Sequence, residues 1–451
     1  MEVFLFKALQ LIIALSILVF VHELGHFMWA RIFKVGVEKF YMFFDAYDFA
    51  LIKWNHEGVY VCNRKVSSRP NPSETEYGIG WVPLGGYCAI VGMVDETHDA
   101  EHAETDRPDA FVKKGKFAQF MIMVGGVLNN LIIAVLIYIG MSWHWGKDII
   151  RMEDLPYGLC YSEYAQQIGF CEGDEVIAVD GKGIDYNALH SALLLANDVT
   201  VRRHGQEVKV DLPDTVGQVF LRDPMQLEIF MTARLPFVVD SVITGSPAAE
   251  AGLTAGDSLA LPYHEVVLTL MAHKNDSVSL DFYRGDSLMS AHMLIGDDGK
   301  MGAFRTNDMA DCYTHIDYTF IEAIPAGIER GWKMLYNYVR QFKLVFTKEG
   351  AQSLGGFGTM GSIFPETWQW MAFWSMTAFF SVALAFMNIL PIPGLDGGHI
   401  FILIIEAIIR RPISDKAKER AQYIGMGIIL ALMIYVNAND IWKFIIKPFF
   451  E

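Results

Sequence analysis

The segment VFVHELGHFM, residues 19–28, places two histidines and a glutamate in one of the most apolar stretches of the chain. His22 and His26 are four residues apart, so both imidazoles lie on one face of a helix and can reach one metal ion. Glu23 follows the first histidine and is suited to act on a water molecule instead of binding the metal. This H-E-x-x-H spacing is typical of zinc peptidases. The alternative is a pair of core histidines beside a glutamate, which the complete five-residue pattern disfavours.

A catalytic zinc ion usually takes three protein ligands and leaves one position for water, so a third ligand must come from another segment. The stretch FMNILPIPGLDGGHI, residues 386–400, contains two candidates, Asp396 and His399. Its prolines break the helical ladder, and a carboxylate in such a segment at membrane depth must be buried in protein or line a wet cavity. We expect Asp396 to be the third ligand, with His399 as its rival. Asn388 could bind a substrate backbone or tie two helices together.

These groups must be positioned by helices that cross a membrane. Of the 451 residues, 52% are hydrophobic, and the excess is concentrated in four stretches with ordinary composition between them. Runs of about 20 apolar residues are long enough to span hydrocarbon as helices. The first lacks a basic leader and a small-x-small cleavage site, so we expect it to be retained. The four predicted transmembrane segments are residues 1–33, 117–143, 368–400 and 421–451.

The positions of lysine and arginine predict the orientation. These residues cluster after the first helix, before the second, and between the third and the fourth, so both connections should face the cytoplasm. The termini and the long segment between the second and third helices would then lie outside the cytoplasm. That outer segment carries most of the net charge of −16, which argues against nucleic acid as a partner. The histidines and Asp396 all fall at cytoplasmic helix ends.

The cytoplasmic loop, residues 34–116, has two parts. Residues 95–109 are acidic without an apolar period and predict a solvated loop. Residues 77–93, YGIGWVPLGGYCAIVGM, are rich in glycine, aromatic and β-branched residues and predict a β-hairpin associated with the membrane surface.

The outer segment contains a weak internal repeat. YAQQIGFCEGDEV and SPAAEAGLTAGDSL share one pattern. In both segments small residues are followed by a glycine with an apolar neighbour, then two further positions, then Gly-Asp. We therefore predict two α+β domains at residues 150–220 and 225–312. Cys160 and Cys171 could form a disulfide in this compartment. Residues 313–367 should form a linker with an amphipathic helix outside the membrane and a glycine-rich loop.

The H-E-x-x-H motif and the later N-x-x-P-x-P-x-L-D-G of Asn388–Gly397 together resemble the site-2 protease family of intramembrane zinc metalloproteases. The PLGGY of Pro83–Tyr87 and the G-x-x-x-N of Gly125–Asn129 also match family elements. The repeated outer segments resemble PDZ modules, as in the bacterial branch of this family. One departure is GGFGTMG, at 355–361, where the family has a different turn.

The resemblance implies that His22, His26 and Asp396 bind Zn²⁺ and that Glu23 is the general base. It also implies cleavage of single-pass membrane proteins inside the lipid bilayer, including anti-sigma factors and remnant signal peptides, with the PDZ-like pair excluding bulky proteins.

Cleavage of a helix requires unwinding, and freed backbone groups in lipid need new partners. We therefore expect the stretch from Trp81 to Ile90 to pair with the substrate as an added strand. The residues predicted to bind substrate are Trp81, Pro83, Leu84, Gly85, Gly86, Tyr87 and Asn388.

The predicted fold is a multi-pass α-helical membrane protein with four transmembrane helices, a membrane-associated β-hairpin and tandem extracytoplasmic PDZ-like domains. Two other functions are compatible with parts of the sequence. A membrane-anchored PDZ scaffold with a structural or inactive metal site would not need Glu23. A metal transporter would more often show repeated helices, which we do not detect here.

Overall fold

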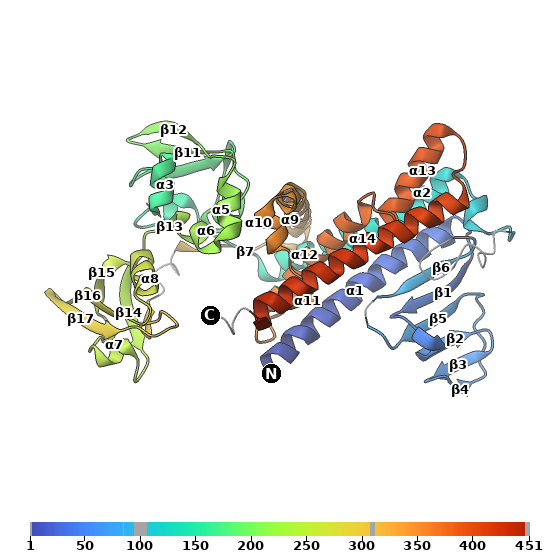
Figure 1. Cartoon of the computed structure of the whole chain (residues 1–451), viewed down its shortest axis with the longest axis horizontal. Helices are drawn as coiled ribbons and strands as arrows, with labels where there is room; N and C mark the ends of the chain where they lie inside the picture. Colours follow the sequence, from blue (N-terminus) through green and yellow to red (C-terminus); the bar gives the residue numbers. More distant parts are fainter. Residues whose placement is uncertain (1, 84, 94–105, 307–311, 447–451) are drawn as a thin grey trace. The chain divides into compact units, whose positions relative to one another are not determined.

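The protein is described here by a computed structural model, which covers residues 2–83, 85–93, 106–306 and 312–446. Leu84, most of the acidic loop at 95–109 and the last five residues of the predicted fourth span lie outside the described residues. The chain divides into two compact units (Figure 1). One comprises residues 1–146, 317–343 and 354–451, and the other comprises residues 147–316 and 344–353.

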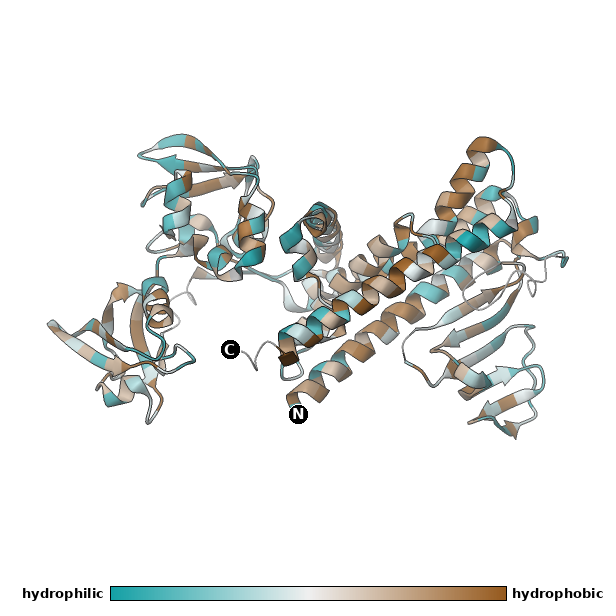
Figure 2. Cartoon of the chain, viewed as in Figure 1, coloured by the Kyte–Doolittle hydropathy of each residue, from teal (hydrophilic) through white to brown (hydrophobic). Residues whose placement is uncertain are grey.

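The first unit is built on four helices that are long and apolar enough to cross a membrane, as predicted. Figure 2 shows hydrophobic residues along most of their length. They are α1 (Glu2–Ile32), α2 (Lys116–Trp145), α12 (Trp370–Ile389) and α14 (Asp415–Ile441), which continues as a π-helical turn at Trp442–Ile446.

The predicted third segment, residues 368–400, contains the helix break that its prolines predict. Helix α12 ends before Pro391 and Pro393, and a separate helix, α13 (Asp396–Ile409), begins after them. Proline lacks the amide hydrogen that would continue the helical ladder, which explains the break. Asp396 is therefore the first residue of a helix, directly after an irregular turn.

Helix α2 lies at the centre of this unit and packs against α1, α9, α12 and α13. Gly25 of α1 and Gly125 of α2 meet closely, since a Cβ atom on Gly25 would lie 2.2 Å from the carbonyl oxygen of Gly125. Small residues allow membrane helices to approach in this way. The contact brings the face of α1 that carries His22 and His26 against α2.

A six-stranded sheet follows α1 in the chain and lies beside it (Figure 1). Its order is β4-β3-β2-β5-β1-β6. The strands are β1 (Val37–Met42), β2 (Ala50–Asn55), β3 (Gly58–Val61), β4 (Arg64–Ser67), β5 (Glu76–Gly80) and β6 (Tyr87–Ile90).

The predicted hairpin at residues 77–93 is wrong in its pairing. Strands β5 and β6 do not pair with each other, because β1 lies between them, parallel to β5 and antiparallel to β6. Alternating apolar residues identify a strand but not its neighbour, which explains the error. Strand β6 therefore lies at the edge of the sheet and contacts α1.

The second unit contains two β-rich domains with separate cores. The first has a sheet of order β10-β9-β11-β12 and a pair of strands, β8 and β13. Its elements are β8 (Leu159–Tyr161), α3 (Glu163–Ile168), β9 (Glu175–Val179), β10 (Lys182–Gly183), α4 (Tyr186–Leu193), β11 (Asp198–Arg203), β12 (Gln206–Asp211), α5 (Val216–Arg222), α6 (Pro224–Phe230) and β13 (Met231–Ala233).

The second domain has a five-stranded sheet of order β17-β16-β15-β14-β18. Its elements are β14 (Pro236–Val242), α7 (Pro247–Glu250), β15 (Ser258–Pro262), α8 (Tyr263–Ala272), β16 (Ser277–Arg284), β17 (Ser287–Leu294) and β18 (Ala303–Arg305). A short pair, β7 (Lys147–Ile149) and β19 (Thr314–Ile316), joins the two ends of the unit's main segment.

The boundary between these domains lies later than the predicted 150–220 and 225–312. The first core includes Phe230, Met231 and Leu235, and the second core begins at Phe237. A boundary drawn from the repeated sequence pattern misses α6 and β13, which return to complete the first core.

The internal repeat corresponds to a repeated ion pair. In each domain a buried aspartate accepts two hydrogen bonds from an arginine, which also donates to a glycine carbonyl, at distances of 2.6–2.8 Å. The groups are Asp174, Arg203 and Gly169 in the first domain, and Asp257, Arg284 and Gly252 in the second. The Cys160–Cys171 disulfide that the sequence allows is not formed, since both thiols are free.

The linker after the second domain forms α9 (Phe320–Gln341), a 3₁₀ turn at Phe342–Phe346, α10 (Lys348–Ser353) and α11 (Phe357–Ser362). Helix α9, which we expect to lie outside the membrane, packs against two of the apolar helices. Gly327 lies against Ile139 of α2, and the ring of Tyr338 contacts Phe386 of α12 at 5.5 Å between centroids.

Candidate metal centre

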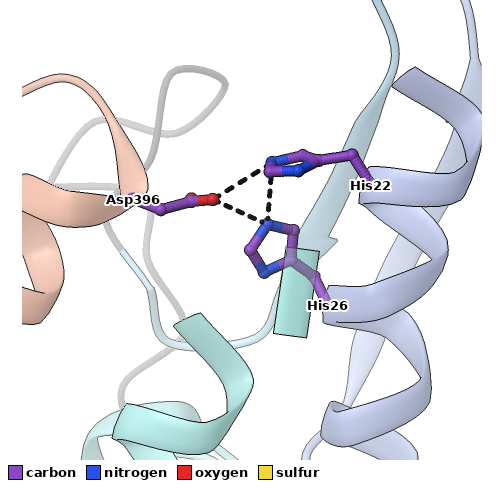
Figure 3. A group of neighbouring side chains, drawn as sticks. All are labelled: His22, His26 and Asp396. Atoms are coloured by element: carbon purple, nitrogen blue, oxygen red, sulfur yellow. Dashed lines mark hydrogen bonds and ion pairs between the residues drawn. The ribbon is translucent and has the colours of Figure 1, made fainter. Parts of the chain in front are cut away.

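His22, His26 and Asp396 meet although they come from opposite ends of the chain (Figure 3). Nε2 of His22 lies 3.0 Å from Oδ2 of Asp396, and Nε2 of His26 lies 3.2 Å from the same oxygen. The two Nε2 atoms are 3.3 Å apart. Both histidines are buried, and the aspartate side chain is 16% exposed. The sequence motifs that predicted a shared site are thus adjacent in space.

The triangle of these three atoms fits a zinc ion. Zn²⁺ bonds of about 2.0–2.1 Å in a tetrahedron separate the ligand atoms by about 3.3 Å. Among the described residues, no group donates a well-aligned hydrogen bond to Oδ2 of Asp396, although two ring nitrogens lie close to it. Such convergence is expected of ligands that share a cation. His399 lines the neighbouring cavity but does not belong to the triangle.

The orientation of His26 is set by α2. Nδ1 of His26 lies 2.9 Å from the carbonyl oxygen of Ile122, which can only accept a hydrogen bond. The proton of a neutral ring is therefore on Nδ1, and the lone pair on Nε2 faces Asp396. Hydrogen bonding of the outer nitrogen is the usual way in which a protein fixes a metal-binding histidine.

Two asparagines flank His22. Nδ2 of Asn130, on α2, lies 3.2 Å from Nδ1 of the ring, and Nδ2 of Asn388, on α12, lies 3.2 Å from Nε2. Asn388 was predicted from the sequence, whereas Asn130 was not.

Gly126 of α2 lies directly against both rings. A Cβ atom at this position would lie 2.5 Å from Nε2 of His26 and 2.6 Å from Cε1 of His22. The sequence GGVLNN contains the G-x-x-x-N spacing twice, and the pair facing the histidines is Gly126 and Asn130 instead of the matched Gly125 and Asn129. Asn129 donates to the carbonyl of Val21 at 3.2 Å. The repeated spacing was the signal that could have identified Asn130.

A cavity of about 530 Å³ lies beside the triangle. Glu23 lines it together with the two histidines and Asp396, so a carboxylate and the three potential ligands share one space. Strand β6 forms part of the wall through Tyr87, Cys88 and Ile90, and Met433 of α14 forms another part.

Four of the seven predicted substrate-binding residues line this cavity: Asn388, Gly85, Gly86 and Tyr87. Trp81 and Pro83 do not line it, and Leu84 lies outside the described residues. The indole nitrogen of Trp81 instead donates to the carbonyl of Ala46 at 3.0 Å. Phe44, which the sequence did not single out, also lines the cavity and stacks on Tyr87 with 6.1 Å between ring centroids.

Comparison with known proteins gives a family and several relatives. The family model of peptidase family M50 matches residues 10–432. A protein of Pasteurella multocida, provisionally named a zinc metalloprotease, is 26% identical over 97% of this chain and 99% of its own length. The regulator of sigma E protease of Haemophilus influenzae is 24% identical over 97% of this chain and 99% of its own length.

Proposed function

The chain belongs to peptidase family M50 and is a zinc metalloprotease, and we propose that it cleaves transmembrane segments of single-pass membrane proteins with zinc bound by His22, His26 and Asp396. The observation that carries the proposal is the triangle of Nε2, Nε2 and Oδ2 atoms with edges of 3.0–3.3 Å, next to a cavity that contains Glu23. Two neutral imidazoles and one carboxylate are a donor set that suits Zn²⁺.

The residues divide the chemistry between them. When bound, zinc supplies Lewis acidity, which polarises a carbonyl and makes water nucleophilic near pH 7. Glu23 accepts the proton of the attacking water and returns it to the leaving amine, which is general acid–base catalysis by one side chain. His22 and His26 can each bind zinc only through an unprotonated Nε2.

We infer that β6 binds the unwound substrate. A transmembrane helix must break internal hydrogen bonds before its carbonyl can be attacked, and the freed groups cost several kcal/mol each in lipid unless they find partners. Among the described residues no strand pairs with the outer edge of β6, and three of its four residues line the cavity. An extended substrate added at that edge would run past the metal ligands. Asn388 could bind a further backbone group.

Proline scanning of residues 81–90 tests this strand addition. Relative to the natural sequence, each folded variant should lose more activity on a helical substrate than on a substrate whose helix already contains a proline near the scissile bond. Equal losses on both substrates would contradict strand addition.

We also propose that the two outer domains are PDZ-like and act as a filter in the periplasm, outside an inner membrane whose cytoplasmic face is closer to the metal. Their repeated aspartate–arginine pair and shared sequence pattern support a tandem. In the first domain a peptide would be added at the edge of β13, but side chains of α4 occupy the backbone groups of that edge. We therefore favour exclusion of bulky proteins over capture of a peptide. Deleting residues 150–312 should then permit cleavage of untrimmed substrates.

The name of one relative supports a proposed substrate class. One relative is named as the regulator of sigma E, so we propose anti-sigma factors and remnant signal peptides as substrates in regulated intramembrane proteolysis. A membrane-anchored scaffold with a structural metal site is the alternative.

One experiment separates these functions. Purified protein in detergent is incubated with a single-span substrate, with and without a chelator, and Glu23→Gln is the matched variant. Chelator-sensitive cleavage that Glu23→Gln loses while it retains zinc supports the protease. Bound zinc without any cleavage by the natural sequence would favour the scaffold.

A further inference from the structure

We propose that Asn130 is a positioning residue that holds His22 in its metal-binding tautomer by accepting the Nδ1 proton. This inference rests on the proposed zinc site of His22, His26 and Asp396. It concerns the side of the His22 ring that faces away from the metal, and it assigns a role to a residue of α2 that the sequence motifs did not single out.

Asn130 is completely buried, and in the part of the chain that the structure describes its side chain contacts the outer nitrogen of His22, at 3.2 Å between Nδ2 and Nδ1. Within the described residues its Oδ1 atom is also buried and has no hydrogen-bond partner. A buried, unpaired carbonyl oxygen is costly, so this amide has an unmet requirement for a donor.

The tautomer of His22 supplies that donor. A neutral imidazole has one proton, and Nε2 can bind a metal only if the proton is on Nδ1. The Nε2 atom of His22 faces Asp396 at 3.0 Å, so it is the metal-facing nitrogen. With the proton on Nδ1, the ring N–H of His22 would face the amino group of Asn130, so that two donors would meet without an acceptor.

Rotation of the amide by 180° removes both problems, because it exchanges the two ends while the rest of the side chain stays in place. Oδ1 then accepts the Nδ1 proton, and the amino group moves to the buried position that Oδ1 had occupied. The opposite arrangement, in which Nδ2 donates to Nδ1, would put the ring proton on Nε2 and aim it at Asp396. The amide orientation therefore decides whether His22 can be a ligand.

The same device is already present at His26, where the carbonyl of Ile122 accepts from Nδ1 at 2.9 Å. Both acceptors belong to α2. The main-chain carbonyl of Asn130 in turn accepts a hydrogen bond from Ser381 of α12 at 2.7 Å, which anchors this turn of the helix. One helix thus orients both rings from behind.

Asn129 provides a matched control, because it has the same side chain on the next position of α2. Its amide donates to the backbone carbonyl of Val21 at 3.2 Å and so ties α2 to α1 without contacting a ligand ring. If Asn130 served only to join helices, the two asparagines would be equivalent.

The test measures zinc affinity of the full-length protein in detergent by competition with a chromophoric chelator, for Asn130→Asp, Asn130→Leu and Asn129→Leu. Loss of an outer hydrogen bond to a metal-bound histidine typically weakens metal binding by about 10–100-fold. Asn130→Leu should show a loss of that size and Asn129→Leu should not. Asn130→Asp should retain zinc, since a carboxylate can only accept from Nδ1.

Asn130→Asp keeps the test decisive if Asn130→Leu does not fold. Weak zinc binding by folded Asn130→Asp, or unchanged binding by Asn130→Leu, would overturn the inference. His22→Ala, measured in parallel, separates this outcome from failure of the proposed site. If His22→Ala loses zinc and Asn130→Leu does not, only the role of Asn130 is wrong, whereas retention of zinc by His22→Ala would refute the site itself.

Discussion

Oδ2 of Asp396 lies 3.0 Å from Nε2 of His22, so the start of α13 meets the C-terminal half of α1. The break between α12 and α13 makes this contact possible. A continuous helix through Pro391 and Pro393 would carry the aspartate along the axis of α12, whereas the turn lets a new helix begin at the carboxylate. A carboxylate at a helix N-terminus is also favoured by the helix dipole.

Asp396→Asn should abolish tight zinc binding, because the amide cannot supply the negative ligand and Oδ2 completes the triangle. The zinc content of purified protein, measured by atomic absorption, checks this expectation. His399→Asn is the control and should retain zinc, since His399 lines the cavity outside the triangle. Loss of zinc in His399→Asn with retention in Asp396→Asn would reverse the choice of third ligand.

Gly126→Ala should displace the histidines, because its methyl group would lie 2.5 Å from Nε2 of His26. We expect a loss of zinc affinity of at least about 10-fold, comparable to removal of a hydrogen bond that orients a ligand. Gly140→Ala is the matched control on the same helix, where nothing lies within 4 Å of the new methyl group. Equal affinity in the two variants would show that α2 yields at Gly126 and does not support the rings.

The cluster of proposed metal ligands and the four apolar helices could be predicted from the sequence, because spacing and hydropathy are local properties. His22 and His26 share a helical face wherever that helix lies. The pairing of β6 with β1 could not be predicted, since it depends on a strand far away in the sequence. Asn130 was missed for a related reason: only the rotation of α2 against α1 decides which of two adjacent asparagines faces His22.

The first outer domain should lose stability in acid through Asp174. Burial is the largest single influence and opposes its charge, but the hydrogen bonds from Arg203 and from the Cys171 amide, together with nearby positive charge, hold the pKa of Asp174 below its usual value. A lowered pKa in the folded state stabilises the domain above the ordinary aspartate pKa of about 4, and that stability is lost as the pH falls through the folded pKa. Hydrogen exchange of β9 and β11 between pH 7 and pH 3 measures this loss.

Asp174→Asn should speed exchange in the first domain already at pH 7 and remove much of its acid dependence. Asp257→Asn provides the reciprocal control, because the hydrogen bonds from Arg284 lower the pKa of Asp257 in the second domain. Each variant should affect its own core. If Asp174→Asn left exchange in β9 and β11 unchanged at pH 7, the ion pair would contribute no stability.

The edge of β13 should open when α4 loses its capping groups. On one side of β13, the carbonyl of Phe230 accepts from the amide of Ser162 and the amide of Arg234 donates to the carbonyl of Gly158, next to β8. The backbone groups of Met231 and Ala233 therefore face the opposite edge. There the amide of Ala233 donates to the hydroxyl of Tyr186 at 3.0 Å, and Nε2 of His190 lies 3.1 Å from the carbonyl oxygen of Met231.

Tyr186→Phe removes the acceptor of the Ala233 amide and keeps the ring. We expect faster hydrogen exchange at Ala233 and measurable binding of a fluorescent peptide with an apolar C-terminus, which the natural sequence should not bind. Tyr157→Phe, at an exposed tyrosine of the same domain, should change neither. If the natural sequence bound the peptide as strongly as Tyr186→Phe does, the cap would not close this edge. The domain would then select substrates by capturing them and not by excluding bulky proteins.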